Sequence, residues 1–266
     1  MIKQQPSDRI CRTNSDNKHF TRHGSVNYMK FGMRSLRRPQ RDIDLINVTS
    51  NRTQMRLLES LSGNKHLINW PISLCPPIGD EITMYIVDSE TNGIHVDACD
   101  IIELGALKVR YSPSAQRLTS IDDMLSCYEA PPNPISDEVI EITGISNEML
   151  TGRMFNNAEV EQWFAEPGAI LCNSKKYEQA FIEKRFPALC GREWLCLQED
   201  IPWTNFGYRR ISLSALLVEY GWHLCHMFTY MDCFAIAYLL VTQPRAFESL
   251  CEALYQEHQS QIEDSI

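Results

Sequence analysis

The sequence predicts an α/β fold in which a mixed sheet is covered by helices. Three strand-like segments joined by short connections follow residue 80, and strands then alternate with helical segments along the rest of the chain. Short connections between strands favour antiparallel hairpins at the start of the sheet. Strands that alternate with helices place those helices over the sheet, so one mixed sheet with helical layers is the economical arrangement.

Each predicted element follows from its local pattern. Strands are expected where apolar residues run between turn-forming residues, and helices where apolar residues recur every three or four positions. Ser136, followed by Glu138 and Glu141, is typical of a helix start. The predicted strands are Met84–Glu90, Asp100–Tyr111, Met124–Pro131, Gly168–Asn173 and Arg192–Asp200. The predicted helices begin at Ser136, Asn156, Ser174, Ser212, Tyr230 and Pro244, and the one from Ser174 ends before Pro187.

The first 80 residues differ in composition from the rest. They carry 13 Lys and Arg against 6 Asp and Glu, whereas the remaining residues carry 12 against 28. Because they show no sustained periodicity and Asn69–Glu81 contains three prolines, we expect a basic, poorly structured extension and linker over 1–80. One globular domain is expected over 81–266. The basic arm could help to hold a nucleic-acid backbone, or it could be a solvated leader.

The sequence also argues against a membrane protein and against a secreted protein. The first residues, MIKQQPSDRICR, lack the apolar core of a secretory signal, and the longest apolar run, Phe234–Val241, is too short to span a bilayer. The 10 cysteines are scattered rather than paired at zinc-like spacings. We therefore expect a protein of the reducing cytoplasm without a disulfide framework.

Four carboxylates predict a metal site. Side chains alternate along a strand, so Asp88 and Glu90 share one face at a carboxyl end, where α/β sheets tend to place ligands. Alone, this pair could equally be a surface feature that caps a turn. However, Glu178 flanks the apolar stripe of its helix, and Asp232 lies on an apolar helix face. Buried acids need a positive partner, and oxygen ligands favour Mg²⁺ or Mn²⁺. Two such ions are typical of phosphoryl hydrolysis.

Several motifs follow one another in a fixed order along the chain. The first, DSETNGI, contains Asp88, Glu90, Thr91 and Gly93, and TGI follows at Thr143, Gly144 and Ile145. The segments NSKKYEQAFI and HMFTYMDC come later and contain Glu178 and Asp232. This order, over about Thr83–Val241, resembles the DEDD superfamily of 3′–5′ exonucleases, and in particular the group similar to the epsilon chain of bacterial DNA polymerase III.

The resemblance implies an RNase H-like core with the four acids at one edge of its sheet. In such enzymes the first Asp bridges two metal ions, and the Glu and the last Asp help to hold the ion that activates water. Those roles would fall on Asp88, Glu90 and Asp232. The residues implied to lie near the terminal nucleotide of a single-stranded 3′ end are Thr91, Gly93, Thr143, Gly144 and Ile145.

Three positions depart from the family pattern. Glu178 stands where the second motif has Asp, and Asn173-Ser174 replaces a His-Asn pair. Met227 stands where a histidine should act as general base, and a thioether cannot take a proton from water. Loss of that base typically lowers the rate by ~10²–10⁴. His226 is the adjacent residue and could replace it.

Two hypotheses follow from these departures. The first is a metal-dependent 3′–5′ exonuclease with attenuated activity, with Asp88, Glu90, Glu178 and Asp232 as ligands and His226 as base. The alternative is a decayed exonuclease fold that binds nucleic acid or a protein partner without turnover. The sequence leaves open whether DNA or RNA is the substrate and whether a polymerase is a partner.

Overall fold

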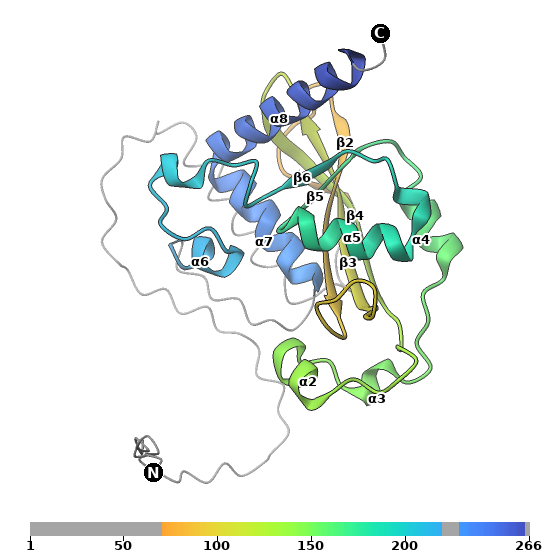
Figure 1. The fold of residues 1–266 in the computed structure, drawn as a ribbon. Coiled ribbons are helices and arrows are strands. Elements are labelled where there is room, and N and C mark those ends of the chain that lie inside the picture. Colours follow the sequence, from red (N-terminus) through yellow and green to blue (C-terminus); the bar gives the residue numbers. More distant parts are fainter. Residues whose placement is uncertain (1–70, 220–228, 264–266) are drawn as a thin grey trace, which may run out of the picture. The chain divides into compact units, whose positions relative to one another are not determined.

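The fold is built on a six-stranded mixed sheet with helices packed against it (Figure 1). The computed structural model describes residues 71–219 and 229–263. The strands lie in the order β1-β4-β3-β2-β5-β6; β1 to β4 pair antiparallel, and β2, β5 and β6 pair in parallel. Their bounds are β1 (Ile72–Ser73), β2 (Ile82–Thr91), β3 (Ile101–Ser112), β4 (Arg117–Tyr128), β5 (Ala169–Cys172) and β6 (Trp194–Cys196). The predicted α/β fold with a mixed sheet is confirmed.

Six of the described helices occur where periodic segments predicted them, with shifts of a few residues at their ends, and the short helix α3 was not predicted. Their bounds are α2 (Asp137–Thr143), α3 (Asn147–Leu150), α4 (Asn157–Trp163), α5 (Lys175–Arg185), α6 (Leu213–Val218), α7 (Thr229–Thr242) and α8 (Pro244–Glu263), with 3₁₀ turns at Pro187–Leu189 and Trp203–Phe206. As predicted, Ser136 is the N-cap of α2, and its side chain accepts a hydrogen bond from the amide of Val139. Among the described residues, no helix has both the length and the apolar character to cross a bilayer.

Three strand or linker predictions need correction. Ile72 and Ser73, which were expected in a linker, form β1 and pair with β4, and the side chain of Ile72 lies in the core. β4 begins at Arg117 because its pairing with β3 begins there, seven residues before the predicted start at Met124. The prediction missed this part because its residues show no clear alternation of apolar and polar side chains. The last strand is shorter than predicted because the amide of Asp200 donates back to the carbonyl of Cys196 and starts a turn. The division of the chain near residue 80 stays a prediction.

Alternation along β2 divides its side chains between two cores. Met84 and Ile86 belong to the core that contains α7 and α8, whereas Tyr85 and Val87 belong to the core that contains α4 and α5. Successive side chains at the end of β2 therefore face α7 on one side of the sheet and α5 on the other.

Candidate functional site

The carboxyl end of β2 presents two acids to the α7 side of the sheet. Asp88 and Glu90 continue the face of Met84 and Ile86; Asp88 is buried and Glu90 is half-buried. β2 pairs with β5 up to Val87 and with β3 through Asp88 and Glu90, so the sheet holds the backbone of both acids in place.

Helix α7 supplies Asp232 from its first turn. The helix packs closely because Gly105, opposite Asp88 in the register with β3, has no side chain. A Cβ atom there would lie 2.5 Å from the Tyr230 amide nitrogen and 2.7 Å from the Thr229 carbonyl carbon. The first turn of α7 therefore lies directly against β3, beside Asp88.

Helix α5 supplies Glu178 from the opposite face of the sheet. Glu178 is in the first turn of α5 and is only 5% exposed. The hydroxyl of Ser89, whose side chain points to the α5 face, donates a hydrogen bond to the Oε2 atom of Glu178. Ser89, between Asp88 and Glu90 in the first motif, thus fixes the carboxylate of the second motif.

The four predicted carboxylates act on one another electrostatically. Burial raises the pKa of Asp88 well above its usual value, and the charges of Glu178, Asp232 and Glu90 raise that pKa further. Burial, with the charges of Glu90 and Asp232, raises the pKa of Glu178 to about 8, although the hydrogen bond from Ser89 opposes that rise. The four acids therefore lie near one another at the end of β2.

The donor chemistry of this cluster fits a hard divalent cation. All four groups are carboxylates, and a cation among them would stabilise the ionised forms that burial and mutual repulsion disfavour. In residues 71–219 and 229–263, however, no three His, Cys, Asp or Glu side chains stand so that they could hold one metal ion. Because Glu178 is directed to Ser89, its side chain would have to turn toward a bound cation.

A fifth acid, Glu103, lies in this cluster and was not among the predicted residues. It is fully buried and lies opposite Glu90 in the β2–β3 register, so its side chain is on the α7 face. Its charge is a further cause of the raised pKa of Asp88. The sequence did offer a sign of it, because Glu103 interrupts the apolar strand segment IIELGALKV.

The residues expected near a terminal nucleotide surround the same end of the sheet. The Thr91 hydroxyl donates to the carbonyl of Gly93 (2.6 Å) and also hydrogen-bonds to the Tyr177 hydroxyl. Thr143–Ile145 ends α2, where Gly144 has a left-handed φ of 72°. Ile145 packs in one cluster with Ile102 of β3. These contacts place both segments near the start of β3, beside the end of β2.

Two sequence-predicted residues lie outside the described part of the chain. His226, the candidate general base, and Met227, which occupies the family's histidine position, fall in the segment 220–228. The assignment of His226 as base stays a prediction.

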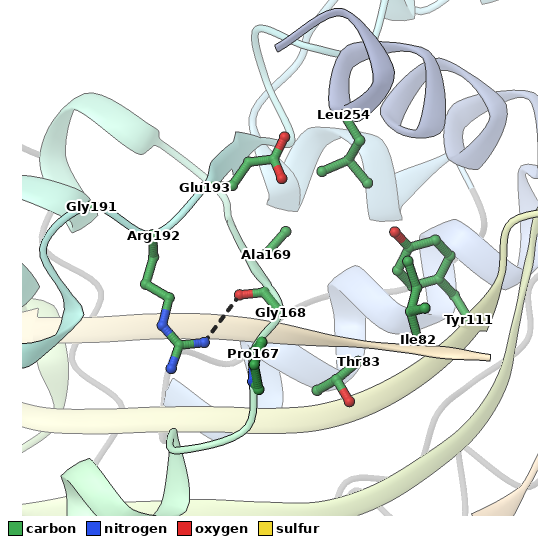
Figure 2. A pocket seen from close by; sticks show the side chains of 10 residues that line it. All are labelled: Ile82, Thr83, Tyr111, Pro167, Gly168, Ala169, Gly191, Arg192, Glu193 and Leu254. Atoms are coloured by element: carbon green, nitrogen blue, oxygen red, sulfur yellow. Dashed lines mark hydrogen bonds between the residues drawn. The ribbon is translucent and has the colours of Figure 1, made fainter. Parts of the chain in front are cut away.

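A hollow of about 580 Å³ lies away from the acids, at the other end of β2 (Figure 2). It is lined by Ile82 and Thr83 at the start of that strand, and by Arg192. The Arg192 guanidinium donates to the carbonyl oxygens of Phe164, Glu166 and Gly168. Its hydrogen bonds are thus used to hold loops together, and none of the predicted site residues lines this hollow.

Comparison with known proteins finds relatives among bacterial DNA polymerase III proteins. No protein-family model matches the sequence. The chain is 28% identical over 160 residues to the DNA polymerase III subunit epsilon of Pasteurella multocida, a match that covers 54% of this chain and 60% of that protein. It is 26% identical over 116 residues to the PolC-type DNA polymerase III of Thermotoga maritima, which covers 43% of this chain and 8% of that protein. The chain thus spans less than two thirds of either relative.

The fold has a counterpart among solved structures. Exonuclease I of E. coli, in complex with a dT13 oligonucleotide, matches with a TM-score of 0.51 at 19% identity, over 62% of this chain and 42% of that chain. At this identity the match shows the fold alone. The two polymerase relatives confirm the predicted resemblance to the epsilon chain of bacterial DNA polymerase III, and the match to exonuclease I agrees with it in fold.

Proposed function

We propose that this protein is a metal-dependent 3′–5′ exonuclease that hydrolyses the terminal phosphodiester of a nucleic acid. The observation that carries the proposal is the gathering of Asp88, Glu90, Glu178 and Asp232, from one strand and two helices, at one end of the sheet. Burial and neighbouring charges raise the pKa of Asp88 and of Glu178, and a bound cation would favour their ionised forms. The similarity to a DNA polymerase III epsilon subunit supports the same activity.

The four carboxylates would hold two Mg²⁺ or Mn²⁺ ions. When bound, such ions supply a nucleophilic hydroxide and neutralise charge on the phosphate and the leaving oxygen. The chain contributes fixed positions for Asp88 and Glu90 on an interior strand. It contributes Asp232 from a helix that Gly105 allows to lie against that sheet. Glu178 would exchange its hydrogen bond with Ser89 for a metal ligand role.

The departure from the family pattern at Met227 affects the proton-transfer step. We assign the role of base to His226, one residue before Met227, because imidazole accepts a proton near neutral pH and a thioether does not. A base displaced by one residue would act less efficiently, so we propose attenuated rather than full activity.

The substrate we propose is a nucleic acid with a single-stranded 3′ end. Thr91 and Gly93, at the end of β2, and the Thr143–Ile145 segment, near the start of β3, would contact its last nucleotides. Exonuclease I, which shares the fold, was solved with a dT13 oligonucleotide.

A polymerase partner is part of the proposal only through the similarity to an epsilon subunit. The cytoplasm as the site of action is likewise a proposal, based on the scattered spacing of the cysteines in the sequence.

The second candidate function is a module that binds nucleic acid or a protein without cleaving it. The bond between Ser89 and Glu178 favours this alternative, because it keeps one predicted ligand away from a metal. The absence of a ready three-ligand arrangement in residues 71–219 and 229–263 favours it as well.

The test uses end-labelled single-stranded DNA and RNA, incubated with the 266-residue chain and Mn²⁺ or Mg²⁺. A 3′ label released as a mononucleotide, with a descending ladder from a 5′ label, would establish both hydrolysis and polarity. Asp88→Ala should abolish the cleavage. No metal-dependent shortening, together with no thermal stabilisation by Mn²⁺, would reject the exonuclease. Retention of the strand without shortening would support the binding module.

A further inference from the structure

The buried carboxylate of Glu103 holds the start of helix α7. The backbone amide of Thr229, the first residue of α7, donates a hydrogen bond of 3.3 Å to the Oε2 atom of Glu103. Glu103 is completely buried and Thr229 is 1% exposed. The first amides of a helix have no partners within the helix, and a negative charge at that end also interacts favourably with the helix dipole.

Two tyrosine side chains also lie close to the Glu103 carboxylate. Burial and then the charge of Glu103 raise the pKa of Tyr230, the second residue of the helix. Burial and a hydrogen bond to Glu103 raise the pKa of Tyr128 on β4. Glu103 is therefore surrounded by partners from β4 and α7.

Gly105 completes the contact from the same face of β3. Glu103 and Gly105 lie two residues apart, so both face α7. Gly105 allows the helix backbone to approach, and its carbonyl accepts a hydrogen bond from the thiol of Cys233 (3.5 Å). Glu103 thus fixes the start of the helix, and Gly105 fixes its distance from the sheet.

We propose that Glu103 is a positioning residue that sets the place of Asp232 by anchoring the amide end of α7 to the sheet. Asp232 is three residues after Thr229, in the turn that Glu103 anchors. Without this anchor the turn could move away from Asp88, and Asp232 would no longer meet the other acids. The expected effect of Glu103 on metal binding rests on the proposed function. The anchoring of α7 by Glu103 does not depend on a metal.

The test compares two substitutions of similar volume. Glu103→Gln keeps a carbonyl oxygen that can accept the Thr229 amide hydrogen, whereas Glu103→Met fills the site without an acceptor. Leu104→Ala is the control for general loss of stability, because Leu104 is equally buried but belongs to the opposite core. The first measurement is hydrogen exchange of the metal-free protein over residues 229–233, with α5 as the internal reference.

We expect Glu103→Met to speed exchange in residues 229–233 by about tenfold or more relative to α5, which corresponds to the loss of a hydrogen bond to a charged group. Glu103→Gln should speed this exchange less than Glu103→Met, because its amide oxygen still accepts the Thr229 amide hydrogen but carries no charge. Leu104→Ala disturbs the core that contains α5, so it should not speed exchange in residues 229–233 relative to α5. Equal exchange of the Met and Gln variants would overturn the anchoring role, whatever the protein does with metal.

The second measurement is the apparent Mn²⁺ affinity from thermal shifts. Replacing a group that orients a metal ligand typically weakens binding by about 10- to 100-fold. We expect a loss of that size for Glu103→Met and a smaller one for Glu103→Gln, which keeps the hydrogen-bond acceptor but lacks the charge. Faster exchange with unchanged Mn²⁺ affinity would overturn the link to Asp232. A wild type that binds no Mn²⁺ would overturn the proposed function and this link with it, but leave the exchange test of anchoring intact.

Discussion

Replacing Glu178 with Gln should stabilise the metal-free protein at alkaline pH. The pKa of Glu178 is raised from an ordinary value of 4.5 to about 8, with burial as the first cause. Because the folded-state pKa lies above the unfolded one, the associated stability is fully present below pH 4.5. It is lost as the pH rises through 8. At about 1.4 kcal/mol for each tenfold change in proton affinity, the loss at pH 8 and above is at most roughly 5 kcal/mol.

Glutamine has nearly the same shape as glutamate, carries no charge and can still accept the hydrogen bond from Ser89. A buried amide makes imperfect hydrogen bonds, which offsets part of the gain, so we expect a net stabilisation of about 2–4 kcal/mol at pH 8. In a domain of this size that corresponds to roughly 5–10 °C in Tm. At pH 5 the folded wild type is already protonated at Glu178, so the difference should shrink to about 1 kcal/mol.

The assay is thermal unfolding of wild type and Glu178→Gln between pH 5 and pH 8.5, with chelator and with Mn²⁺. The variant should lose part or all of the stabilisation by Mn²⁺, since an amide is a weaker ligand than a carboxylate. Glu141→Gln, on an exposed position of α2, is the matched control and should change neither quantity. A Gln variant that is less stable than wild type at pH 8 in chelator would refute the argument that burial and repulsion make the ionised form of Glu178 unfavourable.

Three further substitutions test the remaining parts of the site. Ser89→Ala removes the hydrogen bond that lowers the pKa of Glu178, so the metal-free protein should lose about 1 kcal/mol at pH 8 in urea unfolding; no change would show that the bond contributes nothing. Gly105→Ala places a Cβ atom against the backbone of Thr229. It should lower the free energy of unfolding by about 1–3 kcal/mol and weaken Mn²⁺ binding in thermal shifts. Wild-type stability together with wild-type Mn²⁺ affinity would contradict the close packing of α7. His226→Gln should lower the cleavage rate by about 10²–10⁴ with an unchanged Mn²⁺ shift; an unchanged rate would exclude His226 as base.

The strand end with its paired acids was predictable because it rests on local rules. Alternation alone placed Asp88 and Glu90 on one face, and the apolar residues before them identified the strand. The burial of Glu178 also followed from its position beside the apolar stripe of its helix. By contrast, the partner of Glu178 depends on which strand α5 packs against. That is a tertiary contact, and nothing in the neighbouring sequence identifies Ser89 as the hydrogen-bond donor.

Glu103 and β1 were missed for a different reason. A single acid in an apolar strand predicts a buried charge, but its partner is the amide of Thr229, 126 residues later in the chain. The two-residue strand Ile72–Ser73 is too short to show alternation and lies between prolines, which normally mark a loop. Only its pairing with β4, whose register brings Ile72 opposite Ile121, makes it a strand.

Metal binding and proton transfer depend on separate parts of this molecule, so their measurements identify where any loss of activity arises. The acids lie on β2, α5 and α7, and their interaction with Mn²⁺ is measured by thermal stabilisation without a substrate. The proposed base precedes α7 and affects the rate but not the affinity for metal. A protein that Mn²⁺ stabilises but that cuts slowly would therefore place the deficit at Met227. A protein that cuts slowly and that Mn²⁺ stabilises only weakly would place it at Glu178, whose bond with Ser89 must open for the fourth ligand to reach the ions.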